Sequence, residues 1–318
     1  VNQIAVNLWL KKQVAFDDGA GRDKWEATYV YNANRMVGHA FDRATEDFSV
    51  MLNTSERLIP AGSFIKNKYK KYVFNDISKK NPDDPGAKVK ISPKNQTISV
   101  VLKNEGLGLT FPATAVESRL FLGGRTYLMD IDIARNPKFP NDPQKGKYRR
   151  AIDSNSTAFV VANGLIRSQN VKDSTLKLKM YMADPAFDYT LGDPIMLKIF
   201  NGSTLILEKD ITDFVNVKTV QYLDETVTKI KTPRRVNDPN TDGNGKLKNF
   251  LYHQGTGELN VKIRNPDIDK TELGNSAQDG VHLGVQVTIG TRHYLTSVTF
   301  FETKSGIYTT LMPGKLVE

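Results

Sequence analysis

The chain has 318 residues, of which 39% are hydrophobic and 25% charged, as is usual for a globular protein. It has no cysteine, which excludes disulfides, thiolate metal sites and cysteine nucleophiles. Its net charge of +9 favours an anionic partner, and no apolar run reaches the roughly 18 residues that a membrane-spanning helix needs. The first residue is Val1, which fits a chain whose signal peptide has been removed, and we therefore expect a secreted or cell-surface protein.

The chain begins with a long alternation of apolar and polar residues, which predicts a β-strand over 3–16. DDGAGRD (17–23) and a second alternating segment at 25–31 follow it, so the first strand can close a local hairpin. Alternatively, it can leave its own unit and complete a sheet in a neighbouring molecule, because its apolar face is longer than the second segment can cover. The predicted assembly face consists of Ile4, Val6, Leu8, Leu10, Val14 and Phe16.

Short alternating segments separated by turn residues continue to the end of the chain, and long amphipathic helices are lacking. This pattern predicts an all-β protein built from β-sandwiches. A weak repeat, in which SVMLNTSERLIP corresponds to IMLKIFNGSTLILEKDI, predicts two tandem immunoglobulin-like units. The predicted boundaries are an N-terminal strand at 1–24, unit 1 at 25–135, a linker rich in Pro, Asn and Lys at 136–156, and unit 2 at 157–318.

The region 61–103 is strongly basic, with ten Lys against Asp76, Asp83 and Asp84, which gives +7. It contains no Arg, whereas a protein that recognises nucleic acid usually uses Arg forks, so nucleic acid is a poor candidate partner. The lysines of the strand predicted at 63–75 either protect a sheet edge against aggregation or form an anion-binding face. The candidate face consists of Lys66, Lys68, Lys70 and Lys71.

The segments LIPAGSFIKNKYKKYVF (58–74) and KVKISPKNQTISVVLKNEGL (88–107) resemble repeat modules of secreted, mostly uncharacterised proteins of environmental bacteria. The resemblance covers residues 46–133 well and residues 174–301 only by pattern. It implies a secreted β-sandwich repeat and brings no catalytic residues with it.

The loop NDPNTDGNG (237–245) has Asp238, Asn240, Asp242 and Gly243 at the spacing of an EF-hand-type calcium loop. The twelfth position is Asn249, where a bidentate carboxylate is expected, and lysines lie nearby. A Ca²⁺ site at Asp238, Asn240 and Asp242 and an ordinary polar turn both remain open.

No motif for catalysis or cofactor binding is present, since the four histidines lack metal-ligand spacing and no nucleophile elbow or phosphate loop occurs. We therefore expect a non-catalytic structural subunit of an extracellular filament, sheath or surface layer, which polymerises with itself through donation of the first strand. The alternative is an adhesin module that binds glycans or a cell surface, with anionic polysaccharide as the expected partner. A secreted glycan-processing enzyme comes third.

Overall fold

The computed structural model describes residues 8–310 except 18, 20–21, 32–41, 68–70, 79, 82, 93–96, 123–124, 149–157, 170, 172, 185, 223–224, 241–243 and 274–279. It is almost entirely β-structure, so the predicted fold class is confirmed. The described residues divide into two compact units, 8–158 and 159–310. Among them, no helix has the length and apolar character that crossing a membrane requires.

Unit 1 is one antiparallel sheet of eleven strands in the order β4-β3-β9-β10-β11-β1-β2-β8-β7-β6-β5. The strands are β1 (Leu8–Asp17), β2 (Asp23–Tyr31), β3 (Phe48–Leu52), β4 (Ser55–Ile59), β5 (Ile65–Lys66), β6 (Tyr72–Asn75), β7 (Gly86–Ser92), β8 (Thr97–Lys103), β9 (Ala113–Leu122), β10 (Arg125–Arg135) and β11 (Lys145–Tyr148).

Unit 2 repeats this topology, because its strand order β15-β14-β20-β21-β22-β12-β13-β19-β18-β17-β16 is that of unit 1 with eleven added to each number. The strands are β12 (Ala158–Arg167), β13 (Thr175–Ala183), β14 (Ile195–Asn201), β15 (Thr204–Asp210), β16 (Asn216–Tyr222), β17 (Glu225–Lys231), β18 (Lys246–His253), β19 (Glu258–Arg264), β20 (Val281–Ile289), β21 (Arg292–Lys304) and β22 (Ile307–Thr309). A 3-10 helix η3 (Thr212–Phe214) follows β15, and a short helix α1 (Lys270–Leu273) follows β19.

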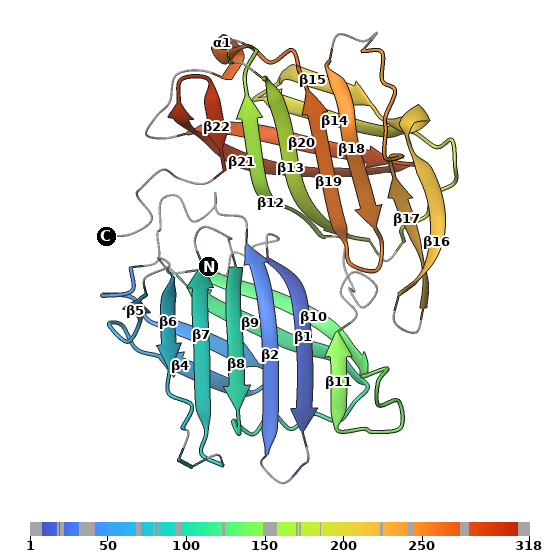
Figure 1. The fold of residues 1–318 in the computed structure, drawn as a ribbon. Coiled ribbons are helices and arrows are strands. Elements are labelled where there is room, and N and C mark those ends of the chain that lie inside the picture. Colours follow the sequence, from blue (N-terminus) through green and yellow to red (C-terminus); the bar gives the residue numbers. More distant parts are fainter. Residues whose placement is uncertain are drawn as a thin grey trace. The chain divides into compact units, whose positions relative to one another are not determined.

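Each sheet folds over itself into two layers around an apolar core, as in a sandwich. In unit 1 the long strand β10 pairs with β9 along most of its length and with β11 only at Ala134 and Arg135, so it passes from one layer to the other. Figure 1 shows β10 crossing behind β1 and β2. The Tyr29 hydroxyl of β2 lies 2.7 Å from the Ser118 hydroxyl of β9 and joins the two layers through the core.

The first strand pairs within its own unit over residues 8–17, which is the local hairpin and not the alternative of donation to a neighbouring molecule. From Leu8 to Asp17, β1 forms a hairpin with β2, and residues 13–16 also pair with β11 on the other side. In Figure 1 the blue strands β1 and β2 lie side by side, with β11 next to β1. The backbone of residues 13–16 therefore has a partner strand of its own unit on each side, while assembly through this strand stays a prediction. Ile4 and Val6 lie outside the described residues.

The predicted apolar face of this strand is not continuous. The register with β2 shifts between Leu10 and Lys12, and a one-residue shift moves the following side chains to the opposite face. Beyond the shift Ala15 is buried at 2% exposure, whereas Phe16 is only half-buried. Alternation in the sequence cannot reveal such an irregularity, since Val14 and Phe16 continue the same spacing.

The boundaries of unit 1 also differ from the predicted ones. β1 belongs to its sheet, and β11 lies within the segment 136–156 that was predicted to be a linker. β11 is only four residues long and holds β1 against β10, so this segment contributes to the fold.

Candidate functional site

The exposed face of β13, β19 and β18 in unit 2 carries a group of basic side chains in two rows. Lys177 of β13 lies directly opposite Lys262 of β19, and Arg264 of β19 lies directly opposite Lys246 of β18. All but Lys262, which is half-buried, are exposed, because the residues between them along each strand point into the core. We call the following residues the basic strip: Lys177, Lys246, Lys248, Lys262 and Arg264.

Like charges that face each other across two strands are destabilising, so the basic strip is an unfavourable arrangement for the protein alone. Among the described residues, none of the five side chains makes an ion pair, whereas the neighbouring Lys179 lies 3.7 Å from the Glu258 carboxylate. Partial burial, together with the charges of Lys177, Arg264 and Lys248, lowers the pKa of Lys262. The strip is therefore a surface whose positive charge would be stabilised by a bound anion.

A hollow of about 370 Å³ opens at one end of the basic strip. It is bordered by the guanidinium of Arg167, which comes from the last residue of β12, and by residues of β13 and β19. Its lining consists of Arg167, Asp173, Ser174, Thr175, Lys177, Lys262, Arg264 and Asn265. Four of the eight side chains are cationic and one is anionic, so this hollow favours a negatively charged group.

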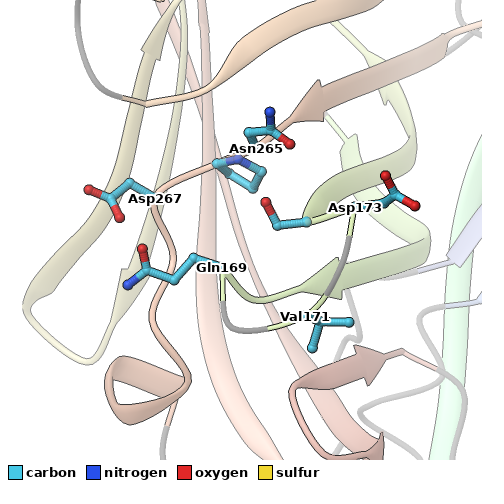
Figure 2. A pocket seen from close by; sticks show the side chains of 7 residues that line it. Gln169, Val171, Asp173, Asn265 and Asp267 are labelled. Atoms are coloured by element: carbon cyan, nitrogen blue, oxygen red, sulfur yellow. The ribbon is translucent and has the colours of Figure 1, made fainter.

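A second hollow of about 450 Å³ adjoins the first, and the two share Asp173, Ser174 and Asn265. Figure 2 shows Gln169 and Asp267 on one side of it and Asp173 on the other. It is formed where the turn between β12 and β13 meets the segment between β19 and α1. Its described lining is mostly polar and consists of Gln169, Val171, Asp173, Ser174, Asn265, Pro266 and Asp267.

The corresponding corner of unit 1 is held by two buried carboxylates. The Asp23 carboxylate accepts the backbone N–H groups of Glu105 and Leu107 at 3.0 and 2.9 Å, and Asp17 accepts that of Leu109 at 2.6 Å. In unit 2 the matching positions are Ser174 and Ser168. Equivalent backbone hydrogen bonds establish this match. The Asn104 N–H donates to Asp23 O in unit 1 as the Asn265 N–H donates to Ser174 O in unit 2, both at 2.9 Å. Likewise, the Asp17 N–H donates to Gln144 O as the Ser168 N–H donates to Gly306 O.

The predicted anion-binding face of unit 1 is only partly described. Lys66 is exposed in the two-residue strand β5, and Lys71 is half-buried and has an interaction partner. Lys68 and Lys70 lie outside the described residues. The structure therefore does not bring these four lysines together as a described site, and the prediction stays untested.

The predicted calcium loop contains a cation supplied by the chain itself. The Lys209 ammonium of β15 lies 2.9 Å from the Asp238 carboxylate and donates to Gly245 O at 2.8 Å, and both charged side chains are almost fully buried. The remaining hydrogen bonds of Asp238 come from the N–H groups of Leu247 and Asn240. Burial alone would raise the pKa of Asp238, but these hydrogen bonds and the ammonium lower it.

Asp238 therefore forms a buried ion pair in the place where Ca²⁺ was expected. An ammonium within hydrogen-bonding distance of the carboxylate opposes a divalent ion at the same oxygens. Asp242 lies outside the described residues, so calcium binding stays a prediction. Within the described part of the chain, His, Asp and Glu form no group of three that could hold a metal ion.

The basic strip itself was not predicted from the sequence. Its signal is the alternation of basic residues in TLKLKMYM (175–182), KLKNF (246–250) and VKIRN (261–265). Such a pattern is typical of any strand with one solvated face. Only the register shows that the basic residues of neighbouring strands face each other.

No protein-family model matches the chain, and no curated protein matches its sequence. The function must therefore be inferred from the two units themselves.

Proposed function

We propose that the chain is a non-catalytic binding protein that holds an anionic polymer on the basic strip of unit 2. The observation that carries this proposal is the register of Lys177 opposite Lys262 and of Arg264 opposite Lys246. A bound polyanion removes the repulsion within both pairs, so the folded protein is more stable with the ligand bound than without it.

The spacing of the basic strip suits an extended polymer. Directly opposed side chains in an antiparallel sheet have Cβ atoms about 5 Å apart, and alternate residues along a strand are about 7 Å apart. Cations at these separations can contact charges that recur along a chain, and such contacts weaken with salt because they lie on an exposed face. A secreted or cell-surface location is part of this proposal, where anionic polysaccharides are available partners.

The test is the binding of polygalacturonate, a linear polyuronate, to the full chain by titration calorimetry. We expect binding that weakens at least about tenfold between low and high salt, because the Debye length falls from roughly 10 Å at 0.1 M towards 3 Å at 1 M. A Lys177→Gln, Lys262→Gln variant is expected to bind at least about tenfold more weakly, equal to about 1.4 kcal/mol.

Lys88→Gln, Lys90→Gln is the control with the same loss of charge, on β7, the unit 1 counterpart of the strand β18 that carries Lys246 and Lys248 of the basic strip. This control variant is expected to bind like the original protein. Equal loss in both variants would show that net charge alone attracts the polymer, and an unchanged affinity in the unit 2 variant would overturn the proposal.

A structural subunit of an extracellular assembly is the second candidate, and one observation favours it. The seven-residue strand β16 is the last strand of its sheet and pairs only with β17 among the described strands. An edge strand of this length, with no second partner among the described strands, can be extended by another copy of the chain.

Sizing and negative-stain microscopy test this second candidate. The two variants are Thr219→Pro and Val220→Pro. Because neighbouring N–H groups of a strand point to opposite edges, one variant removes an N–H that faces β17 and the other removes an N–H on the outer edge of β16. The variant that changes the outer edge is expected to keep its fold. If the chain assembles through β16, the original protein forms a polymer and this variant does not. A monomer at high concentration would exclude this candidate.

A further inference from the structure

We infer that the second hollow, lined by Gln169, Asp173, Asn265 and Asp267, is a subsite for sugar hydroxyl groups. The ligand of the basic strip is then an acidic polysaccharide, and a polyphosphate or a nucleic acid is excluded. This inference rests on the proposed binding of an anionic polymer and specifies its chemistry.

The two hollows form one continuous site with a change of polarity along it. The first is dominated by Arg167, Lys177, Lys262 and Arg264, and the described lining of the second is polar with two carboxylates, Asp173 and Asp267. A ligand that suits both sets of described side chains therefore carries negative charge at one end and neutral polar groups at the other. A chain of sugar rings in which carboxylate or sulfate groups are accompanied by hydroxyl groups meets this requirement.

The side chains of the second hollow suit hydroxyl groups and disfavour phosphate. A carboxylate is an acceptor only, so Asp173 and Asp267 attract the hydroxyl hydrogens of a sugar and repel the oxygens of a phosphate. Amide side chains such as Asn265 offer both donors and acceptors to a hydroxyl group. The described residues that line the two hollows include no aromatic side chain, whereas single-stranded nucleic acids are usually held by stacking on aromatic rings.

The second hollow is also held in shape by hydrogen bonds within unit 2. The Gln169 amide donates to the Asp269 carboxylate at 2.9 Å, and Gln169 N donates to Ile268 O at 3.0 Å. Asp269 in turn accepts Thr271 N, and its own N–H donates to Glu272, so the start of α1 is fixed. A site that is already formed loses less conformational entropy when a ligand binds.

The experiment compares polygalacturonate with inorganic polyphosphate as probes of the full chain, by titration calorimetry at one salt concentration. The variant is Asp173→Asn, Asp267→Asn, which keeps the shape of both side chains and removes two negative charges beside the strip. Asp173 has φ = 60°, and Asn tolerates this conformation well.

If the hollow binds hydroxyl groups, the variant binds polygalacturonate at least about fivefold more weakly, while it binds polyphosphate as well as or better than the original protein. If the hollow takes no part, removing negative charge strengthens the binding of both probes, and that result overturns the inference. Tighter binding of polyphosphate than of polygalacturonate by the original protein also overturns it.

Different results would contradict the proposed function itself. If the original protein binds neither probe, or if Lys177→Gln, Lys262→Gln leaves both affinities unchanged, the basic strip is not the binding surface and the inference falls with it. A third result would keep the basic strip as the binding surface and reject only the subsite. In it, Lys177→Gln, Lys262→Gln no longer binds polyphosphate, and Asp173→Asn, Asp267→Asn binds polygalacturonate like the original protein.

Discussion

Units 1 and 2 share one strand order and use charged residues differently on matching surfaces. In unit 1, Glu26 lies opposite Val101, and the Lys24 ammonium lies 2.6 Å from the Glu26 carboxylate. In unit 2, the matching positions are Lys177 and Lys262, which face each other without an ion pair among the described residues. Unit 1 also has two directly opposed lysines on this surface, Lys24 and Lys103, but there Lys24 forms the ion pair with Glu26. The five residues of the basic strip have no such ion pair among the described residues, which is why we place the binding surface on unit 2.

The two units also differ in how deeply they bury an ion pair at matching positions. Arg57 of β4 pairs with Asp76 in unit 1, and Lys209 of β15 pairs with Asp238 in unit 2. The positions match, since Arg57 lies opposite Val50 and Lys209 lies opposite Leu197 in the equivalent hairpins. The side chains of the first pair are 29% and 34% exposed, and those of the second only 1% and 2%.

The largest predicted effect comes from this second difference. Replacing Lys209 by Met leaves the buried Asp238 carboxylate without its cation, which is expected to lower the free energy of unfolding of unit 2 by about 3–5 kcal/mol. Arg57→Met breaks a partly exposed pair and is expected to cost about 1 kcal/mol or less by loss of charge. Urea denaturation of both variants measures the difference. Equal losses would show that burial does not distinguish the two pairs.

A smaller effect on stability is expected at the corner that forms the two hollows in unit 2 and is held by buried carboxylates in unit 1. Asp23→Ala removes the acceptor of two backbone N–H groups in unit 1, and we expect a loss of about 1–3 kcal/mol. Ser174→Ala, at the matching position of unit 2, is expected to change the stability by about 0.5 kcal/mol or less. Thermal unfolding of the two variants tests the match, and a large effect of Ser174→Ala would contradict it.

Acid is predicted to weaken unit 2 through Asp238. The pKa of this carboxyl is lower in the folded protein than its ordinary value of 3.8, so its contribution to stability is complete above that value. The contribution is lost as the pH falls below 3.8 through the lowered pKa of the folded state.

Unfolding measured from pH 5 to pH 2.5 checks this dependence. The difference in stability between the original protein and Asp238→Asn should narrow as the pH falls, because the variant has no carboxyl group to protonate. A constant difference over this range would mean that Asp238 does not titrate as the structure implies.

Much of the fold could be predicted from the sequence, because alternation and turn residues are local signals. They predicted the all-β class, and the hairpin of 3–16 with 25–31 was one of two open alternatives. The short strand β11 could not be found, since KGKY (145–148) has no apolar alternation and forms only because β1 and β10 lie on either side of it.

The candidate site was less accessible to prediction, because it depends on contacts between distant segments. The Asp238 loop has the spacing of a calcium site, but its cation comes from Lys209, 29 residues earlier in the chain. Likewise, Lys177 and Lys262 are 85 residues apart, and no local pattern states that they face each other.

The most direct test of the central claim is the substitution Lys177→Glu, followed by two measurements on the same protein. Glu at this position, which matches Glu26 of unit 1, faces Lys262 and converts a repulsive cross-strand pair into an attractive one. We expect the free energy of unfolding to rise by about 0.5–1 kcal/mol and the affinity for polygalacturonate to fall at least about tenfold. Unchanged or lower stability together with unchanged affinity would contradict the claim that unit 2 maintains an unfavourable group of charges in order to bind an anionic ligand.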